Sequence, residues 1–335
     1  MISLNFPVQI VDLYRTIFEN SHVRVKYQNA FSEDWQAIRG VRQGGVTSAF
    51  LFSIYIDEVL TKISAQQDGC WLGLKRVNIQ AYADDLVVFC PTVKGLKNLL
   101  KLIENSLAYL ELEVNMGKTK VVVFSKRKYP GNKLNFLIND KNIKIVNEYL
   151  YLGTVISGNL SERNAIERIV SKFNKKVGMF FRKFSSIALH IKMQLFDSLC
   201  MSLYGLDTIF DNKNCSEILR KLSVSYHYAL KRLLGFLKRE SNHYTCMLLE
   251  KMTFEHYMNF QKTKFLFWMH NSRSPCLVGL KNYITKFSVY AKGISAFWSS
   301  KYHVRNVLDN DLCALRSRIS YVQNREDSSY VDYVS

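Results

Sequence analysis

The chain has 335 residues, 48% of them hydrophobic, which is enough for a packed core and excludes a wholly disordered protein. Lys and Arg number 46 against 28 Asp and Glu, so the formal net charge is +18. An excess of this size favours a polyanionic partner, nucleic acid or an acidic membrane surface, over a basic protein without one. No block of consecutive basic residues marks a membrane-anchoring tail, so we expect nucleic acid.

The apolar residues of the N-terminal part predict helices and strands in alternation. Residues 8–20 have helical spacing, and residues 22–28 alternate as a half-buried strand whose hairpin partner is 35–38. Residues 48–64 read as a helix that is apolar on almost every side, and we therefore expect this helix to be buried.

Further short elements are predicted in the middle of the chain. Apolar segments on both sides of residues 82–85, "YADD", read as strand, turn and strand, and Pro91 ends the second strand. An amphipathic helix over 96–110 follows. After it we expect a strand over 120–124, a basic turn region over 125–133 and short strands over 143–157.

From about residue 160 the apolar spacing becomes helical and stays so. Helical patterns continue through 192–209 and 216–236, and the polar tail from Asn324 is expected to fray. The sequence thus predicts a mixed α/β region up to about residue 158, followed by a basic helical region.

Cysteine usage and hydropathy bear on the cellular compartment. The seven cysteines are widely scattered and form no CxxC pair, which argues against a disulfide scaffold. No apolar run approaches the roughly 18 residues of a membrane span, and the N-terminal residues lack the pattern of a signal peptide. We expect an intracellular protein, in the nucleus or the cytoplasm, without a membrane partner. Nothing in the sequence predicts an oligomeric state.

Asp84 and Asp85 are two adjacent carboxylates between apolar segments. Successive side chains of a regular strand point to opposite faces, so the two can serve one site only where the chain turns. A divalent cation would neutralise both, and Mg²⁺ prefers carboxylate oxygens. The alternative is a hairpin turn with two solvated aspartates.

Three other motifs accompany this pair in a fixed order. They are "RGVRQGGVTSAFLF" upstream, and "NMGKTKVVVF" and "EYLYLGTVIS" downstream. With these four elements, residues 8–240 resemble the reverse transcriptase domain of non-LTR (LINE-like, jockey-type) retrotransposons. The resemblance implies an α+β fold, in which a partial polymerase palm, an antiparallel sheet with helices, precedes an all-helical thumb and a C-terminal helical region.

The resemblance also implies domain limits. Residues 1–125 would be a partial palm without its first catalytic strand and fingers, and 126–158 would form primer-grip-like strands. Residues 159–240 would be the helical thumb, and 241–335 a C-terminal helical region with a frayed tail.

The resemblance assigns roles to individual residues. Asp84 and Asp85 would be catalytic ligands of Mg²⁺ (or Mn²⁺). Gln43 and Gly44 would line the pocket of the incoming nucleotide, although Ala49 stands where the family commonly has proline. Lys118 would assist the leaving pyrophosphate, a role for which Lys120 competes; a plain solvated lysine is the alternative. Tyr151, Leu152 and Gly153 would form the primer grip, or simply a turn between strands.

Basic residues of the thumb region would contact the phosphates of a template–primer duplex. A solvated basic face is the alternative. These residues are Arg168, Lys172, Lys175, Lys176, Arg182 and Lys183.

The family has a third catalytic aspartate on a strand upstream of the region that begins near Phe6, and neither Asp12 nor Asp34 matches it. We therefore expect an N-terminally truncated RNA-directed DNA polymerase domain that extends a DNA primer on an RNA template from deoxynucleoside triphosphates, impaired on its own. The alternatives are a non-enzymatic nucleic-acid-binding remnant of a retrotransposon and an unstable relic.

Overall fold

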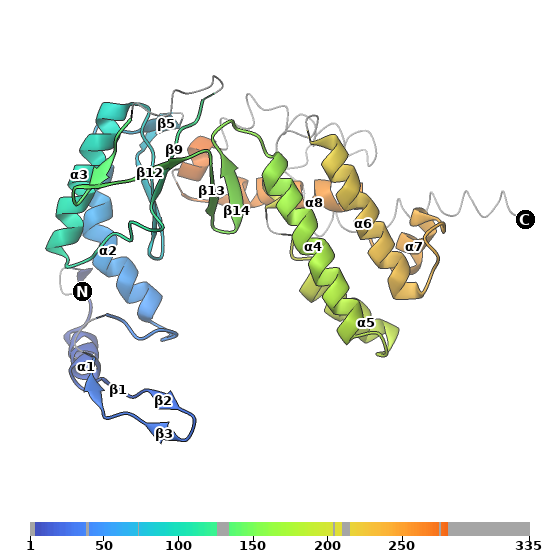
Figure 1. The fold of residues 1–335 in the computed structure, drawn as a ribbon, viewed down its shortest axis with the longest axis horizontal. Coiled ribbons are helices and arrows are strands. Elements are labelled where there is room, and N and C mark those ends of the chain that lie inside the picture. The colour runs from blue at the N-terminus through green and yellow to red at the C-terminus, as the bar shows by residue number, and fades with distance from the viewer. Residues whose placement is uncertain are drawn as a thin grey trace, which may run out of the picture. The chain divides into compact units, whose positions relative to one another are not determined.

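The computed structural model describes residues 4–37, 40–72, 74–125, 134–203, 205–209, 215–274 and 276–280. The chain divides into two compact units (Figure 1). The first unit comprises Met1–Cys70 and Val77–Val114, and the second comprises Trp71–Arg76 and Asn115–Ser335.

The first unit begins with α1 (Val8–Glu19), which confirms the first predicted helix. Two short hairpins follow, each antiparallel: β1 (His22–Val23) with β4 (Trp35–Gln36), and β2 (Lys26–Tyr27) with β3 (Ala30–Phe31). The predicted pairing of the two segments is confirmed. The prediction of one continuous, half-buried strand is wrong, because β1 and β2 are separate and exposed. Alternating apolar residues are buried only where a second layer covers them.

The core of the first unit lies between α2 (Ser48–Ser64) and α3 (Val93–Tyr109). Helix α3 is confirmed, and Thr92 caps it by accepting a hydrogen bond of 3.1 Å from the Gly95 N–H. The expectation that α2 is buried on every side is wrong, because its buried residues lie three and four positions apart and so occupy one face. The buried apolar residues of this core are Ile56, Val59, Ile63, Ile79, Leu99, Ile103 and Leu107.

Strands β7 (Ile79–Tyr82) and β8 (Asp85–Val88) form the predicted hairpin around "YADD". The second strand ends at Val88, before Pro91. Buried Asn78 fixes the start of the hairpin by donating a hydrogen bond of 2.6 Å to the carbonyl of Ile63 at the end of α2. The strands before it are β5 (Cys70–Leu72) and β6 (Lys75–Val77).

The strands of the second unit are short, as predicted for 143–157. β9 (Lys120–Val122) pairs in parallel with β12 (Lys144–Val146). β10 (Leu137–Ile138) pairs with β11 (Lys141–Asn142), and β13 (Glu148–Tyr151) with β14 (Thr154–Ser157), both antiparallel. Residues 126–133 of the predicted basic turn region lie outside the described residues.

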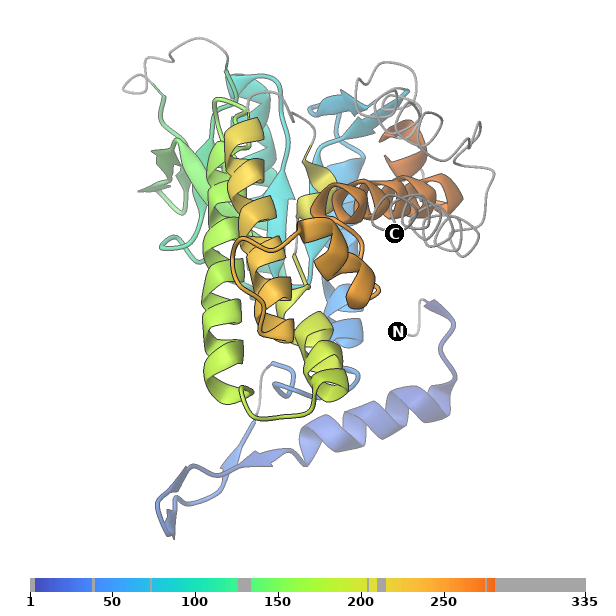
Figure 2. The ribbon, with the colours of Figure 1, turned by 90° about the vertical axis from the view of Figure 1, so that its right-hand side faces the viewer.

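The helices of the second unit surround its larger core. Figures 1 and 2 show α4 (Arg163–Lys183) and α6 (Ser216–Leu234) running side by side. Buried Ile166, Phe173 and Phe180 recur on the face of α4 that enters this core. The remaining elements are α5 (Leu189–Cys200), η3 (Leu206–Thr208), α7 (Asn242–Leu248) and α8 (Phe254–Asn271).

The helix predicted through 192–209 is wrong in its second half. Helix α5 ends at Cys200, and Gly205 has a φ of +85°, a left-handed conformation that favours glycine and ends regular helix. The helix predicted over 216–236 is confirmed by α6, and the tail from Asn324 lies outside the described residues. The α+β fold class, with a helical region after a strand-containing one, is confirmed. No described helix is both long and apolar enough to cross a membrane.

Candidate active site and nucleic-acid interface

Asp84 and Asp85 lie at the tip of the β7–β8 hairpin. Tyr82 pairs with Asp85, so Ala83 and Asp84 form a two-residue turn and Asp85 is the first residue of β8. Ala83 has a φ of 52°, a conformation that is unfavourable for residues with a Cβ and occurs often at functional sites. The turn places the two carboxylates next to each other at one end of a hairpin.

Both carboxylates are exposed, and neither makes a hydrogen bond or an ion pair with another described residue. Tyr82 beside them is also exposed, at 65%. Asp12 and Asp34, the other two aspartates considered as metal ligands, already pair with arginines. Asp12 pairs with Arg15 at 3.0 Å, and Asp34 pairs with Arg24, whose hydrogen bond lowers the pKa of the Asp34 carboxyl.

The donor set of the hairpin fits part of a magnesium site. Carboxylate oxygens are the ligands that Mg²⁺ prefers, and the ion usually keeps several waters and binds substrate phosphates. Among the described residues, no three His, Cys, Asp or Glu side chains form a group that could hold a metal. Asp84 and Asp85 therefore offer two protein ligands, and the described part of the chain adds no third.

Gln43 and Gly44 form the middle of a turn before α2. The Gly45 N–H donates a hydrogen bond of 3.0 Å to the carbonyl of Arg42, and Gly44 has a φ of +80°. A positive φ at the third position of such a turn favours glycine. Gln43 is exposed, so its amide is accessible to a ligand. This turn and the acidic hairpin both belong to the first unit.

Lys118 belongs to the second unit, in the turn before β9. Its backbone N–H donates a hydrogen bond of 3.1 Å to the Asn115 side chain, and its side chain is exposed. The Lys118 ammonium has no hydrogen-bond partner among the described residues. By contrast, the Lys120 ammonium donates to the Gly117 carbonyl at 2.6 Å, which favours Lys118 as the available cation.

Leu152 and Gly153 form the two-residue turn between β13 and β14, and Tyr151 ends β13. The φ angles of Leu152 and Gly153 are 45° and 82°. Positive φ at both positions is the geometry that suits the twist of a hairpin, although asparagine is more usual than leucine at the first. Leu152 is 40% exposed, so this strained turn presents an apolar side chain to solvent.

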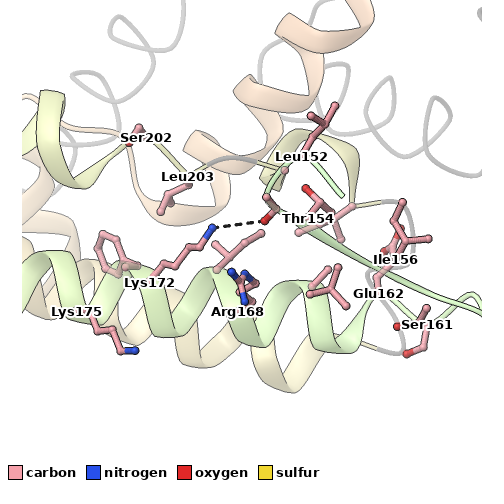
Figure 3. A pocket seen from close by; sticks show the side chains of 18 of the residues that line it. Leu152, Thr154, Ile156, Ser161, Glu162, Arg168, Lys172, Lys175, Ser202 and Leu203 are labelled. Atoms are coloured by element: carbon pink, nitrogen blue, oxygen red, sulfur yellow. Dashed lines mark hydrogen bonds between the residues drawn. The ribbon is translucent and has the colours of Figure 1, made fainter. Parts of the chain in front are cut away.

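A cavity of about 830 Å³ joins this turn to the basic side of α4 (Figure 3). One wall is the β13–β14 hairpin, and another is the segment from Ser202 to Ile209. The third is α4, on which Arg168, Lys172, Lys175 and Lys176 line the cavity. Since Arg168, Lys172 and Lys176 follow one another at intervals of four, they lie on one side of the helix.

The structure thus brings together part of the predicted set. Leu152 and Gly153 share one cavity with four of the six predicted cations, whereas Arg182, Lys183 and Tyr151 do not line it. Ser202 was missed, although it accepts a hydrogen bond of 2.7 Å from the Lys176 ammonium. Gly205 was missed too; a glycine between helical patterns is a turn signal that could have revealed it.

Part of the chain is similar to known proteins. Residues 4–156 match the family described as "Reverse transcriptase (RNA-dependent DNA polymerase)". The acidic hairpin, the Gln43–Gly44 turn, Lys118 and the Leu152–Gly153 turn all lie within the matched residues.

Two curated relatives also match part of the chain. The chain is 31% identical over 112 residues to the Retrovirus-related Pol polyprotein from type-2 retrotransposable element R2DM of Drosophila melanogaster. It is 30% identical over 108 residues to the corresponding polyprotein from type-1 retrotransposable element R2 of Nasonia vitripennis. These matches cover 33% and 32% of this chain. The chain spans about a tenth of the length of either relative.

Proposed function

We propose that the chain is an RNA-directed DNA polymerase that extends a DNA primer on an RNA template, with deoxynucleoside triphosphates as substrates. One observation carries the proposal: two exposed aspartates, free of ion pairs with described residues, lie at the tip of a tight hairpin inside the segment that matches the reverse transcriptase family. We expect this activity in the nucleus or the cytoplasm. A jockey-type origin stays a prediction, because the two relatives come from R2 elements.

Asp84 and Asp85 would hold the divalent cation, Mg²⁺ or Mn²⁺. Such ions, when bound, lower the barrier to phosphoryl transfer by stabilising charge on the attacking and leaving oxygens. The contribution of this chain is to keep the two carboxylates together at the tip of a hairpin, with Asp84 in the two-residue turn and Asp85 at the start of β8, where strand pairing holds the register. Because their carboxylates are not neutralised by neighbouring Lys or Arg among the described residues, their charge is available to a cation.

Gln43, Gly44 and Lys118 would bind the incoming nucleotide. An exposed glutamine amide offers both a donor and an acceptor to a base or a sugar. Gly44 lets the backbone approach a ligand where a Cβ would be unfavourable at its φ of +80°. The Lys118 ammonium would neutralise charge on the leaving pyrophosphate and could donate a proton to it.

The cavity beside α4 would hold the primer–template backbone. Its cations suit phosphate oxygens, and such contacts provide affinity without sequence choice. The exposed Leu152–Gly153 turn would contact the primer end as the primer grip. In this scheme residues 1–125 would act as a partial palm, 126–158 as primer-grip-like strands, 159–240 as the thumb and 241–335 as an additional C-terminal region.

A primer-extension assay on an RNA template tests the polymerase proposal. We expect extension that requires Mg²⁺ or Mn²⁺ and is slow, because the described residues supply two carboxylates rather than three. Asp84→Asn and Asp85→Asn should each lower the rate by at least about 100-fold, since each removes a charge that the cation needs.

Asp140→Asn is the matched control. Asp140 is an exposed aspartate in the turn between β10 and β11, and its φ of 55° is one that asparagine also tolerates. This variant should retain the activity of the unmodified chain. Extension that survives in both Asp84→Asn and Asp85→Asn would contradict the proposal.

A second candidate function is nucleic-acid binding without catalysis. The absence of a third metal-binding side chain near the pair, within the described residues, favours it. Salt-sensitive binding of an RNA–DNA hybrid, together with no extension in either metal, would support this binding function over the polymerase.

A further inference from the structure

The cations of α4 that line the cavity fall into two classes by their contacts. The Lys172 ammonium lies 3.5 Å from the Gly153 carbonyl oxygen and donates to it, as the dashed line in Figure 3 marks. The Lys176 ammonium donates to the Ser202 hydroxyl at 2.7 Å and approaches the Ser202 carbonyl at 3.4 Å. Arg168 and Lys175 make no hydrogen bond or ion pair with another described residue.

The two bonded lysines connect α4 to the other two walls of the cavity. Lys172 reaches the tip of the β13–β14 hairpin, and Lys176 reaches the segment after α5. These walls also approach each other closely, because a Cβ on Gly205 would lie 3.3 Å from the Thr154 hydroxyl. Lys172 and Lys176 therefore bridge parts of the chain that are 19 and 26 residues away from them.

We propose that these cations have two different roles. Arg168 and Lys175 contact phosphates of the nucleic acid, whereas Lys172 and Lys176 are positioning residues that keep the walls of the cavity in place. The proposal rests on the proposed nucleic-acid binding and deepens it. Hydrogen bonds to protein acceptors use some of the three N–H donors of an ammonium and fix its position, so Lys172 and Lys176 have fewer donors to offer a phosphate than a lysine without such bonds. Glu162, which also lines the cavity, adds a repulsive charge near the start of α4.

The turn that Lys172 supports needs such support. Leu152 has a positive φ of 45°, which costs about 1 kcal/mol or more for a residue with a Cβ. A cation on the Gly153 carbonyl favours the conformation that presents Leu152 to solvent. Without this hydrogen bond the turn should therefore loosen, although no phosphate ligand is removed.

Two measurements on the full chain separate the roles. The first is the dependence of hybrid affinity on KCl concentration, followed by fluorescence anisotropy with an RNA–DNA duplex. A plot of log affinity against log salt has a negative slope. Removal of one phosphate-binding side chain makes this slope less steep, by about 0.7–0.9. Arg168→Met and Lys175→Met should each show this decrease and a loss of affinity of about threefold or more. Lys172→Met and Lys176→Met should leave the slope unchanged.

The second measurement is hydrogen exchange of backbone amides. Lys172→Met should speed exchange at Thr154, and Lys176→Met should speed it at Leu203, each by at least about threefold. Lys172→Arg should restore slow exchange, because a guanidinium also donates to a carbonyl. Lys175→Met should leave exchange at these amides unchanged.

Lys221→Met serves as the control for removal of one positive charge. Lys221 is an exposed lysine of α6 that pairs with Glu217 and does not line the cavity, so slope and exchange should stay as in the unmodified chain. Equal slope decreases in Lys172→Met and Lys175→Met, with unchanged exchange in both, would overturn the division of roles. A chain that does not bind the hybrid at all would contradict the proposed nucleic-acid binding instead, and the exchange measurements would still decide whether Lys172 and Lys176 hold the walls.

Discussion

The hydroxyl of Tyr149 donates a hydrogen bond of 3.1 Å to the carbonyl oxygen of Lys118. Tyr149 lies in β13, the strand that leads to the Leu152–Gly153 turn, and Lys118 lies just before β9. A single bond thus connects the candidate primer grip to the turn that carries the candidate pyrophosphate ligand.

Tyr149→Phe removes this hydrogen bond and keeps the ring. We expect the free energy of unfolding to fall by about 0.5–1.5 kcal/mol, the usual net value of one such bond. If Lys118 assists the leaving group, the rate of primer extension should also fall. Thermal unfolding and extension assays check both effects. Tyr27→Phe is the control, because Tyr27 is 74% exposed and its hydroxyl has no hydrogen-bond partner among the described residues.

Ala83→Gly tests strain at the acidic turn. Glycine adopts a φ of 52° without the penalty that alanine has, so the variant should be as stable as the unmodified chain or up to about 1 kcal/mol more stable. Ala83→Val should lower stability by about 1–2 kcal/mol, because a branched Cβ makes this φ worse. In Ala81→Gly, within regular β7, we expect a loss of about 0.5–1 kcal/mol. If Ala83→Gly lowers the free energy of unfolding as Ala81→Gly does, the turn is not strained.

Gly205→Ala tests the close approach of the cavity walls. Gly205 has a φ of +85°, and a Cβ there would lie 3.3 Å from the Thr154 hydroxyl, so we expect a loss of about 1–3 kcal/mol. Gly178→Ala is the opposite case, because Gly178 lies inside α4 and a Cβ there meets nothing within 4 Å. Alanine is the better helix former, so this variant should gain about 0.5–1 kcal/mol. Chemical denaturation measures the free energy of unfolding of the two variants. An equal change in both would refute the steric explanation.

His227 should make stability sensitive to acid. Burial lowers the pKa of this imidazole below 6.5, helped by the nearby Lys231 charge and opposed by a hydrogen bond to the Ser223 carbonyl. Nδ1 lies 2.8 Å from that carbonyl, and Nε2 accepts a bond from the Phe254 N–H, an arrangement that requires the neutral ring.

The unfolded chain takes up a proton on His227 near pH 6.5, whereas the folded chain does so only at lower pH. This contribution to the free energy of unfolding is therefore complete above pH 6.5 and decreases as the pH falls below it. His227→Gln should weaken the dependence, and His190→Gln, on an exposed residue of α5, should not. Denaturant titrations between pH 5 and 8 provide the measurement; a dependence that His227→Gln leaves intact would show that other groups cause it.

Lys262 should make the free energy of unfolding depend on pH in the alkaline range. Its side chain is only 2% exposed, and burial lowers the pKa of the ammonium from 10.5 to about 8, against the attraction of Glu162. Between pH 8 and 10.5 the unfolded chain holds one more proton than the folded chain, so stability should rise with pH, by roughly 3 kcal/mol at most.

Lys262→Met should abolish that rise, because methionine has no proton to lose and fills a similar volume. Lys264→Met, two residues away on the exposed side of α8, should keep the rise. Unfolding measured from pH 7 to 10.5 compares them. An identical rise in Lys262→Met and the unmodified chain would mean that the buried amine is not its source.

The sequence by itself determined the local elements and the order of the motifs. Short-range rules were sufficient where neighbouring residues decide the conformation: the helical spacing of α1, α3, α4 and α6, and the turn between β7 and β8 that holds Asp84. The resemblance to reverse transcriptases was also apparent in the sequence, because motif order and spacing are readable without any knowledge of packing.

Burial and long-range partners were decided only by the tertiary structure. Apolar residues around α2 predict a buried helix, but the first unit covers one face of it, and burial depends on which elements arrive from elsewhere in the chain. In the same way, six basic residues of one helix look alike in sequence. The structure separates Lys172 and Lys176, which bond to Gly153 and Ser202, from Arg168 and Lys175, which make no such bonds among the described residues. A side chain's partners 19 or 26 residues away follow from how the chain folds back on itself, and local spacing carries no information about that.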